Sequence, residues 1–119
     1  MEKELLSNVL QISGQLKVLH WQTTSYAEHN AFERIYDSLG DLFDKLIEVY
    51  SGKYERPKFG GVQDLSFADY DSIKVDAFIS AAEEFFVDAF MAEQDSELAN
   101  IKDEIIAELQ QLKYLLSLK

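Results

Sequence analysis

Two histidines lie nine residues apart in the first third of the chain, at His20 and His29, and the sequence holds no others. Glu33 follows His29 by four residues, and Asp44 precedes Glu48 by the same spacing. Residues four apart on a helix lie one turn apart on one face, so each pair can offer two ligands to one hard or borderline metal ion. A lone histidine near a helix end is more often a surface or capping residue, and an acidic helix face is more often simply solvated. The spacing therefore predicts metal chemistry while leaving those two alternatives open.

Distance along a helix decides how such ligands could cooperate. With His29 as the origin and about 100° per residue, the three carboxylate candidates lie at about 40°, 60° and 100°, in one sector. Glu33 and Asp44 are about 16 Å apart along the axis, which is too far for one metal site. A second copy of the helix, antiparallel across a two-fold axis near residue 39, brings the His–Glu pair of each chain to the Asp–Glu pair of the other. His20 would supply a further nitrogen, so the sequence predicts two identical sites per homodimer.

The elements that must position these residues are helices. Four stretches carry apolar residues at three- and four-residue steps, and strand-like alternation is almost absent. The predicted helices span residues 3–23, 27–51, 74–92 and 96–117. Short links join the first two and the last two, whereas the link between the second and third is long enough to run the length of a bundle. The expectation is an all-α, ferritin-like four-helix bundle of two antiparallel hairpins joined by a long crossover, as a single domain over residues 1–119.

Local signals refine this expectation. Asp95 or Ser96 is placed to cap the free N–H groups of the fourth helix. Within the crossover, residues 66–70 are expected to form a short turn of helix that docks on the bundle. Three acidic residues of the third helix, Glu83, Glu84 and Asp88, are expected to be solvated.

Composition limits the function classes. The length of 119 residues is near that of one domain, and 11 basic against 22 acidic residues give a net charge of -11. That charge opposes binding to nucleic acid and to anionic membranes, so neither is an expected partner. The chain has no cysteine, so any metal must use histidine and carboxylate ligands. With no signal-peptide pattern and no apolar run long enough to span a bilayer, a cytoplasmic location is expected.

At the same residues the chain resembles a known family. The segment Lys17-Val-Leu-His20-Trp21, followed by His-x-x-x-Glu and Asp-x-x-x-Glu, is similar to the ferroxidase signature of Dps miniferritins, with Glu33 where Asp is usual. The resemblance implies that His20, His29 and Glu33 are ligands from one subunit. It implies that Asp44 and Glu48 come from the two-fold related subunit. Trp21 would then lie beside the site, and Lys17 among the residues that surround the ligands.

The resemblance also implies an activity. Fe(II) would be bound at the dimer interface, as one ion or as a di-iron pair, and oxidised by hydrogen peroxide or dioxygen, with Zn or Mn as substitutes. The homodimer would form through helix 27–51, alone or within a twelve-subunit cage that stores iron. The compact chain is also similar to small ferritin-like proteins of viral genomes, for which the location would be the host cytoplasm. The alternative is a non-enzymatic helical assembly protein whose acidic surface binds metal at most incidentally.

Overall fold

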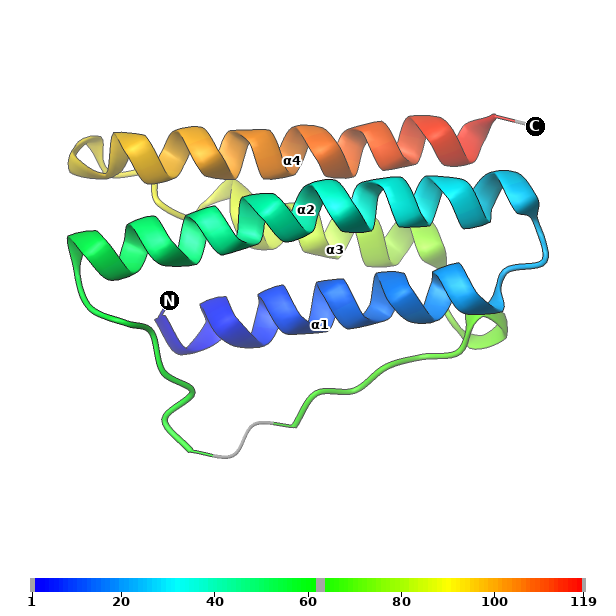
Figure 1. Cartoon of the computed structure of the whole chain (residues 1–119), viewed down its shortest axis with the longest axis horizontal. Coiled ribbons are helices and arrows are strands. Elements are labelled where there is room, and N and C mark those ends of the chain that lie inside the picture. Colours follow the sequence, from blue (N-terminus) through cyan, green and yellow to red (C-terminus); the bar gives the residue numbers. More distant parts are fainter. Residues whose placement is uncertain (1, 62–63, 119) are drawn as a thin grey trace.

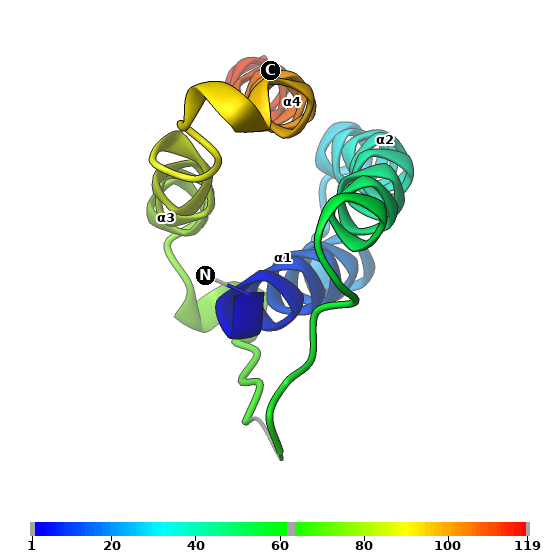
Figure 2. The same cartoon turned by 90° about the vertical axis from the view of Figure 1, so that its left-hand side faces the viewer.

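The computed structural model describes residues 2–61 and 64–118, and over these residues the protein is all-helical. Its long helices are α1 (Glu2–Gln22), α2 (Tyr26–Lys53), α3 (Val75–Val87) and α4 (Ser96–Ser117), with short 3-10 helices at Tyr70–Ser72 and Glu93–Asp95. The pairs α1–α2 and α3–α4 form antiparallel hairpins, and the connection between them runs back along the outside of α1 (Figure 1). Viewed end-on, the four helices stand at the corners of a quadrilateral around one core (Figure 2). The all-α expectation and the helical bundle are confirmed.

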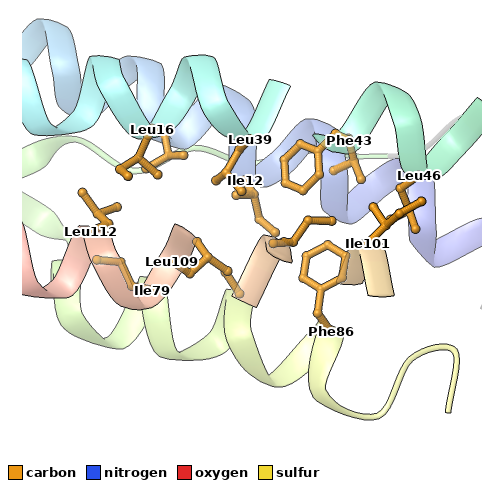
Figure 3. Close-up of a cluster of buried hydrophobic side chains, with 14 of the residues drawn as sticks. Ile12, Leu16, Leu39, Phe43, Leu46, Ile79, Phe86, Ile101, Leu109 and Leu112 are labelled. Carbon is orange, nitrogen blue, oxygen red and sulfur yellow. The ribbon is translucent and has the colours of Figure 1, made fainter. Parts of the chain in front are cut away.

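Each helix turns one apolar stripe inward, as the spacing predicts. On α1 the buried residues recur at three- and four-residue steps, and on α2, α3 and α4 the same pattern supplies aromatic and aliphatic partners. Figure 3 shows these side chains meeting between the helices, with Phe43 of α2 near Phe86 of α3; their ring centroids are 5.9 Å apart. No helix in the described part of the chain is both long enough and apolar enough to cross a membrane.

The third helix is shorter than predicted. It ends at Val87 instead of residue 92, because Phe90 takes a left-handed backbone conformation with φ of 53°. Lys102 of α4 donates from Nζ to the carbonyl oxygen of Val87 at 3.1 Å and so satisfies one of the free carbonyls at this helix end. Apolar periodicity continues through Phe90, which is buried, so the pattern alone could not locate the end of the helix.

Two expectations about acidic residues are corrected. Asp95 occupies the N-cap position of α4, as expected, but its side chain makes no capping hydrogen bond. Its carboxylate instead accepts a hydrogen bond from the Tyr54 hydroxyl and lies 3.2 Å from Lys53 Nζ. Lys53 also contacts Glu97 at 2.6 Å, so these side chains tie the end of α2 to the start of α4. Glu83 is likewise paired rather than solvated, 2.7 Å from Lys113 Nζ of α4.

This tie between α2 and α4 makes the fold sensitive to acid. The hydrogen bond from Tyr54 lowers the pKa of Asp95, and the hydrogen bond from Lys53 lowers the pKa of Glu97. A carboxylate with a lowered pKa stabilises the fold at neutral pH, and that contribution is lost as pH falls through its folded-state pKa. We expect Asp95→Asn to flatten the pH dependence of the free energy of unfolding on the acid side, measured by urea denaturation. The exposed Glu104→Gln serves as control, and equal slopes in the two variants would contradict the prediction.

Residues 66–69 of the crossover are extended, and the helical turn that was expected at residues 66–70 begins only at Tyr70, in the 3-10 helix Tyr70–Ser72. The side-chain amide of Gln15 on α1 makes two hydrogen bonds to the backbone of Ala68. It donates to the carbonyl oxygen at 2.9 Å and accepts from the N–H at 2.8 Å. Gln11 holds Ser66 in the same way. Four helical residues rise about 6 Å and two extended residues about 6.6 Å, so the glutamines match every second residue of the crossover. Side-chain amides thus take the place of a neighbouring strand.

Gln15 is expected to matter more than Gln11 for stability. Its side chain is only 2% exposed, and Gln15→Leu leaves a half-buried N–H and carbonyl of Ala68 without partners. A loss of about 2 kcal/mol in the free energy of unfolding is expected. Gln11→Leu is the matched control, because its partner Ser66 is exposed to water, and it should cost less than about 1 kcal/mol. Urea denaturation measures the free energy of unfolding of both variants. Equal losses would show that the hydrogen bonds of Gln15 to Ala68 do not stabilise the fold more than those of Gln11 to Ser66.

Candidate metal site

The two histidines meet at the turn between α1 and α2. Residue His20 lies in the last turn of α1, and a three-residue link leads to α2, where Ser25 caps the helix by accepting from the Glu28 N–H at 3.2 Å. His29 lies one turn into α2. Because the two helices are antiparallel neighbours, the imidazole rings stack, with centroids 3.9 Å apart and planes inclined by 19°.

Each histidine is held by the backbone of the other. Nδ1 of His20 lies 2.9 Å from the carbonyl oxygen of His29, and Nδ1 of His29 lies 2.9 Å from the carbonyl oxygen of His20. A carbonyl oxygen only accepts, so each Nδ1 carries a proton, and it is then Nε2 whose lone pair is left to bind a metal ion. A hydrogen bond from one ring nitrogen to a carbonyl is how metal-binding histidines are commonly oriented. His20 is 6% exposed, so its ring is fixed in a largely dry position.

Glu33 completes a cluster with these histidines. One ring nitrogen of each histidine and one carboxylate oxygen of Glu33 lie within 4.8 Å of one another. Among the described residues, no second group of three or more potential metal ligands lies this close together. The structure therefore brings together His20, His29 and Glu33, the three residues assigned to one subunit from the sequence.

Asp44 and Glu48 lie elsewhere on the same helix. Ile35, Leu39 and Leu46 turn one side of α2 into the core, and both carboxylates are exposed on the opposite side. Asp44 is eleven residues beyond Glu33, about 16 Å along the helix, so one chain does not bring it to the histidines. A Cβ at Gly40, midway along this face, would have open space around it.

Lys17 and Trp21 border the histidines on α1. Lys17 Nζ lies 4.5 Å from the ring centroid of Tyr36 on α2 and 6.0 Å from that of Trp21, within range for cation–π attraction. Trp21 is 68% exposed, a large apolar surface next to His20. The contact with Tyr36 joins two helices, so helical spacing within α1 gave no signal for it.

Sequence reasoning also missed Glu28 and Tyr70. The Glu28 carboxylate accepts from the Thr23 hydroxyl at 2.6 Å and from the Tyr70 hydroxyl at 2.7 Å, and this last bond raises the pKa of Tyr70. Tyr70 thereby anchors the crossover to the hairpin that carries the histidines. The capping pattern Ser25-x-x-Glu28 was a sequence signal for this turn, although the glutamate side chain binds Thr23 and Tyr70.

Two comparisons with known proteins bear on this site. A family model described as "Family of unknown function (DUF5856)" matches residues 20–116, a range that includes all five ligand candidates. The chain is also 30% identical over 117 residues to the "Uncharacterized 14.6 kDa protein in mobD-ri intergenic region" of Enterobacteria phage T4, covering 98% of this chain and 88% of that protein. No solved structure matches. Because the family model covers most of the chain, the protein belongs to the DUF5856 family.

Proposed function

We propose that the protein is a ferritin-like, Dps-type ferroxidase, which binds Fe(II) as substrate at a site shared between two copies of the chain. The observation that carries this proposal is the histidine pair. The Nδ1 atoms lie against carbonyl oxygens, which leaves the Nε2 atoms to bind metal, and one ring nitrogen of each histidine lies within 4.8 Å of a Glu33 carboxylate oxygen. The order of the helices supports it further, because two antiparallel hairpins joined by one long crossover are typical of ferritin-like bundles. Asp44 and Glu48 of the partner would complete each site.

The donor set suits iron. Imidazole nitrogens bind Fe(II) and Zn(II) well, and carboxylate oxygens favour harder ions such as Mn(II) and Fe(III). A ligand lone pair of imidazole lies in the plane of its ring. The two ring planes are nearly parallel and the centroids 3.9 Å apart, so no ion near the rings can lie in both planes. This stacking favours one ion for each histidine, and hence a di-iron pair over a single iron.

The chain's own groups have separate roles in the proposed reaction. Two Fe(II) ions give up one electron each, and one hydrogen peroxide takes up both electrons and two protons to form two water molecules; dioxygen is the other candidate oxidant. The Glu33 carboxylate, with those of the partner, stabilises the additional positive charge on Fe(III). Neutral imidazole holds the ferrous ion, and the hydrogen bond at Nδ1 keeps each ring from rotating away.

The test is Fe(II) oxidation with and without the histidines. Protein loaded anaerobically with Fe(II) is mixed with peroxide, and ferric absorbance is followed over time. Iron should be oxidised faster with the wild-type protein than in buffer alone. With His20→Ala/His29→Ala the rate should be lower than that of the wild type by at least about tenfold. Tyr114→Ala, an exposed residue on α4, is the control. Equal rates in all three proteins would favour the alternative, a non-enzymatic helical assembly protein with incidental metal binding.

A further inference from the structure

The outer face of α2 is strongly acidic. Five exposed carboxylates line the side of the helix that faces away from the core, and they are Glu33, Asp37, Asp41, Asp44 and Glu48. The ion pairs found among the described residues involve other acids, namely Asp95, Glu97 and Glu83. The nearest positive residues of α2, Arg34 and Lys45, lie about 140° and 160° around the helix from His29, so they border the face beside Asp41 at about 120° and are outnumbered by its five carboxylates. This face therefore carries negative charge that the chain itself does not neutralise.

In the proposed shared site, the acidic face of α2 lies against the same face of the partner chain. A two-fold axis near residue 39 that brings Glu33 to the partner's Asp44 also brings Asp37 to the partner's Asp41. At the ends of the contact, histidines and carboxylates from both chains surround the proposed metal. At the centre, acidic residues face acidic residues with no histidine between them. Like charges brought close across an interface oppose association.

We infer that a divalent cation switches this protein between separate chains and the two-fold dimer. Without metal, the ten carboxylates of the two faces repel one another. With metal at both sites, each ion adds positive charge between the carboxylates of the two chains. Open space at Gly40 leaves room for the two helices to approach. The inference rests on the proposed shared site and adds its regulation, because assembly and metal binding strengthen each other by the same factor.

The experiment measures the dimer dissociation constant by sedimentation equilibrium, in EDTA and with saturating Zn(II) as a redox-silent probe. We expect at least about a hundredfold tighter dimer with Zn(II), a coupling in the range known for linked binding. Zinc binding itself is measured separately by calorimetry. This second readout keeps failure of the inference distinct from failure of the proposed function.

A charge-neutral variant tests the cause. Asp37→Asn/Asp41→Asn removes the central acids and leaves all five ligand candidates in place, so in EDTA its dimer should be about tenfold tighter than that of the wild type or more. Asp103→Asn/Glu104→Gln removes the same charge from exposed positions on α4 and should leave the constant unchanged. Circular dichroism confirms that both variants are folded.

Each remaining outcome is decisive. A wild-type protein that stays fully dimeric in EDTA at every concentration measured overturns the switch and leaves the shared site standing, whereas a measurable dimer constant that bound Zn(II) does not change overturns both. Zinc that binds without assembly, or no zinc binding at all, overturns both the switch and the shared site. If the Asp37/Asp41 variant behaves like the α4 control, repulsion at the centre of the contact is not what separates the chains.

Discussion

Two inactive variants are expected to restore Fe(II) oxidation when they are mixed. One chain carries His29→Ala/Glu33→Ala and the other Asp44→Ala/Glu48→Ala, so a homodimer of either lacks two of the five ligands at both sites. A mixed dimer has one intact site and one site that keeps only His20 of its five ligands. With random pairing half of the dimers are mixed, so about one quarter of the wild-type sites are restored. Preferential metal binding to mixed dimers would raise this toward one half.

The measurement is the initial rate of ferrous oxidation after the variants are unfolded together and refolded with metal present. Native mass spectrometry of chains with different masses establishes how many mixed dimers exist. Each variant refolded alone is the control and should stay near the rate in buffer. No recovery of activity despite proven mixed dimers would remove the shared-site model, because every ligand it requires is then present in one assembly.

Helical periodicity predicted the bundle because burial follows spacing. The stripe on α1, from Leu5 through Leu19, is buried at each of its three- and four-residue steps, and Phe86 of α3 lies in the same core. Periodicity failed where contacts join distant parts of the chain. Gln15 holds Ala68, 53 residues away, and Tyr54 holds Asp95, 41 residues away. Such contacts between side chains and distant parts of the chain produce no periodic pattern in the sequence.

The candidate site was also predictable where it depends on spacing along the chain, and not where it depends on packing between helices. Spacing placed His29 and Glu33 one turn apart, and the short link returned His20 to their side, as the structure shows. The exchange of Nδ1 contacts between the two histidines could not be predicted, because it depends on how closely α1 and α2 pack. Asp44 and Glu48 lie on the predicted face of α2, but their role depends on a second chain.

A large apolar side chain is exposed beside the candidate site. A solvated face needs no large apolar side chain, yet Trp21 is 68% exposed next to His20. Aromatic side chains of this kind are enriched in protein interfaces, where their burial contributes to association. A single exposed tryptophan is compatible with both functions, so the response of the whole protein to metal must decide between them.

Metal is expected to raise the thermal stability of the protein in a saturable way. An ion bound only by the folded dimer stabilises it by about 2.7 kcal/mol at a hundredfold excess over its dissociation constant. For a chain of this size that corresponds to a melting temperature higher by on the order of 10 °C. Zn(II) or Mn(II) serves as the redox-silent ion, and calorimetry or circular dichroism follows unfolding as its concentration rises.

Replacing the histidines shows whether the rise in melting temperature comes from the candidate site or from the acidic surface. In His20→Ala/His29→Ala the stacked pair is lost, so the increment should shrink, with each protein compared to its own metal-free melting temperature. Asp103→Asn/Glu104→Gln on α4 should keep the full increment, because it removes acidic charge away from the site. An acidic surface that binds cations only incidentally predicts a small, unsaturated rise that persists without the histidines. If the histidine variant responds to metal as the parent does, His20 and His29 are structural residues of the hairpin, and the ferroxidase proposal must be abandoned while the helical bundle stands.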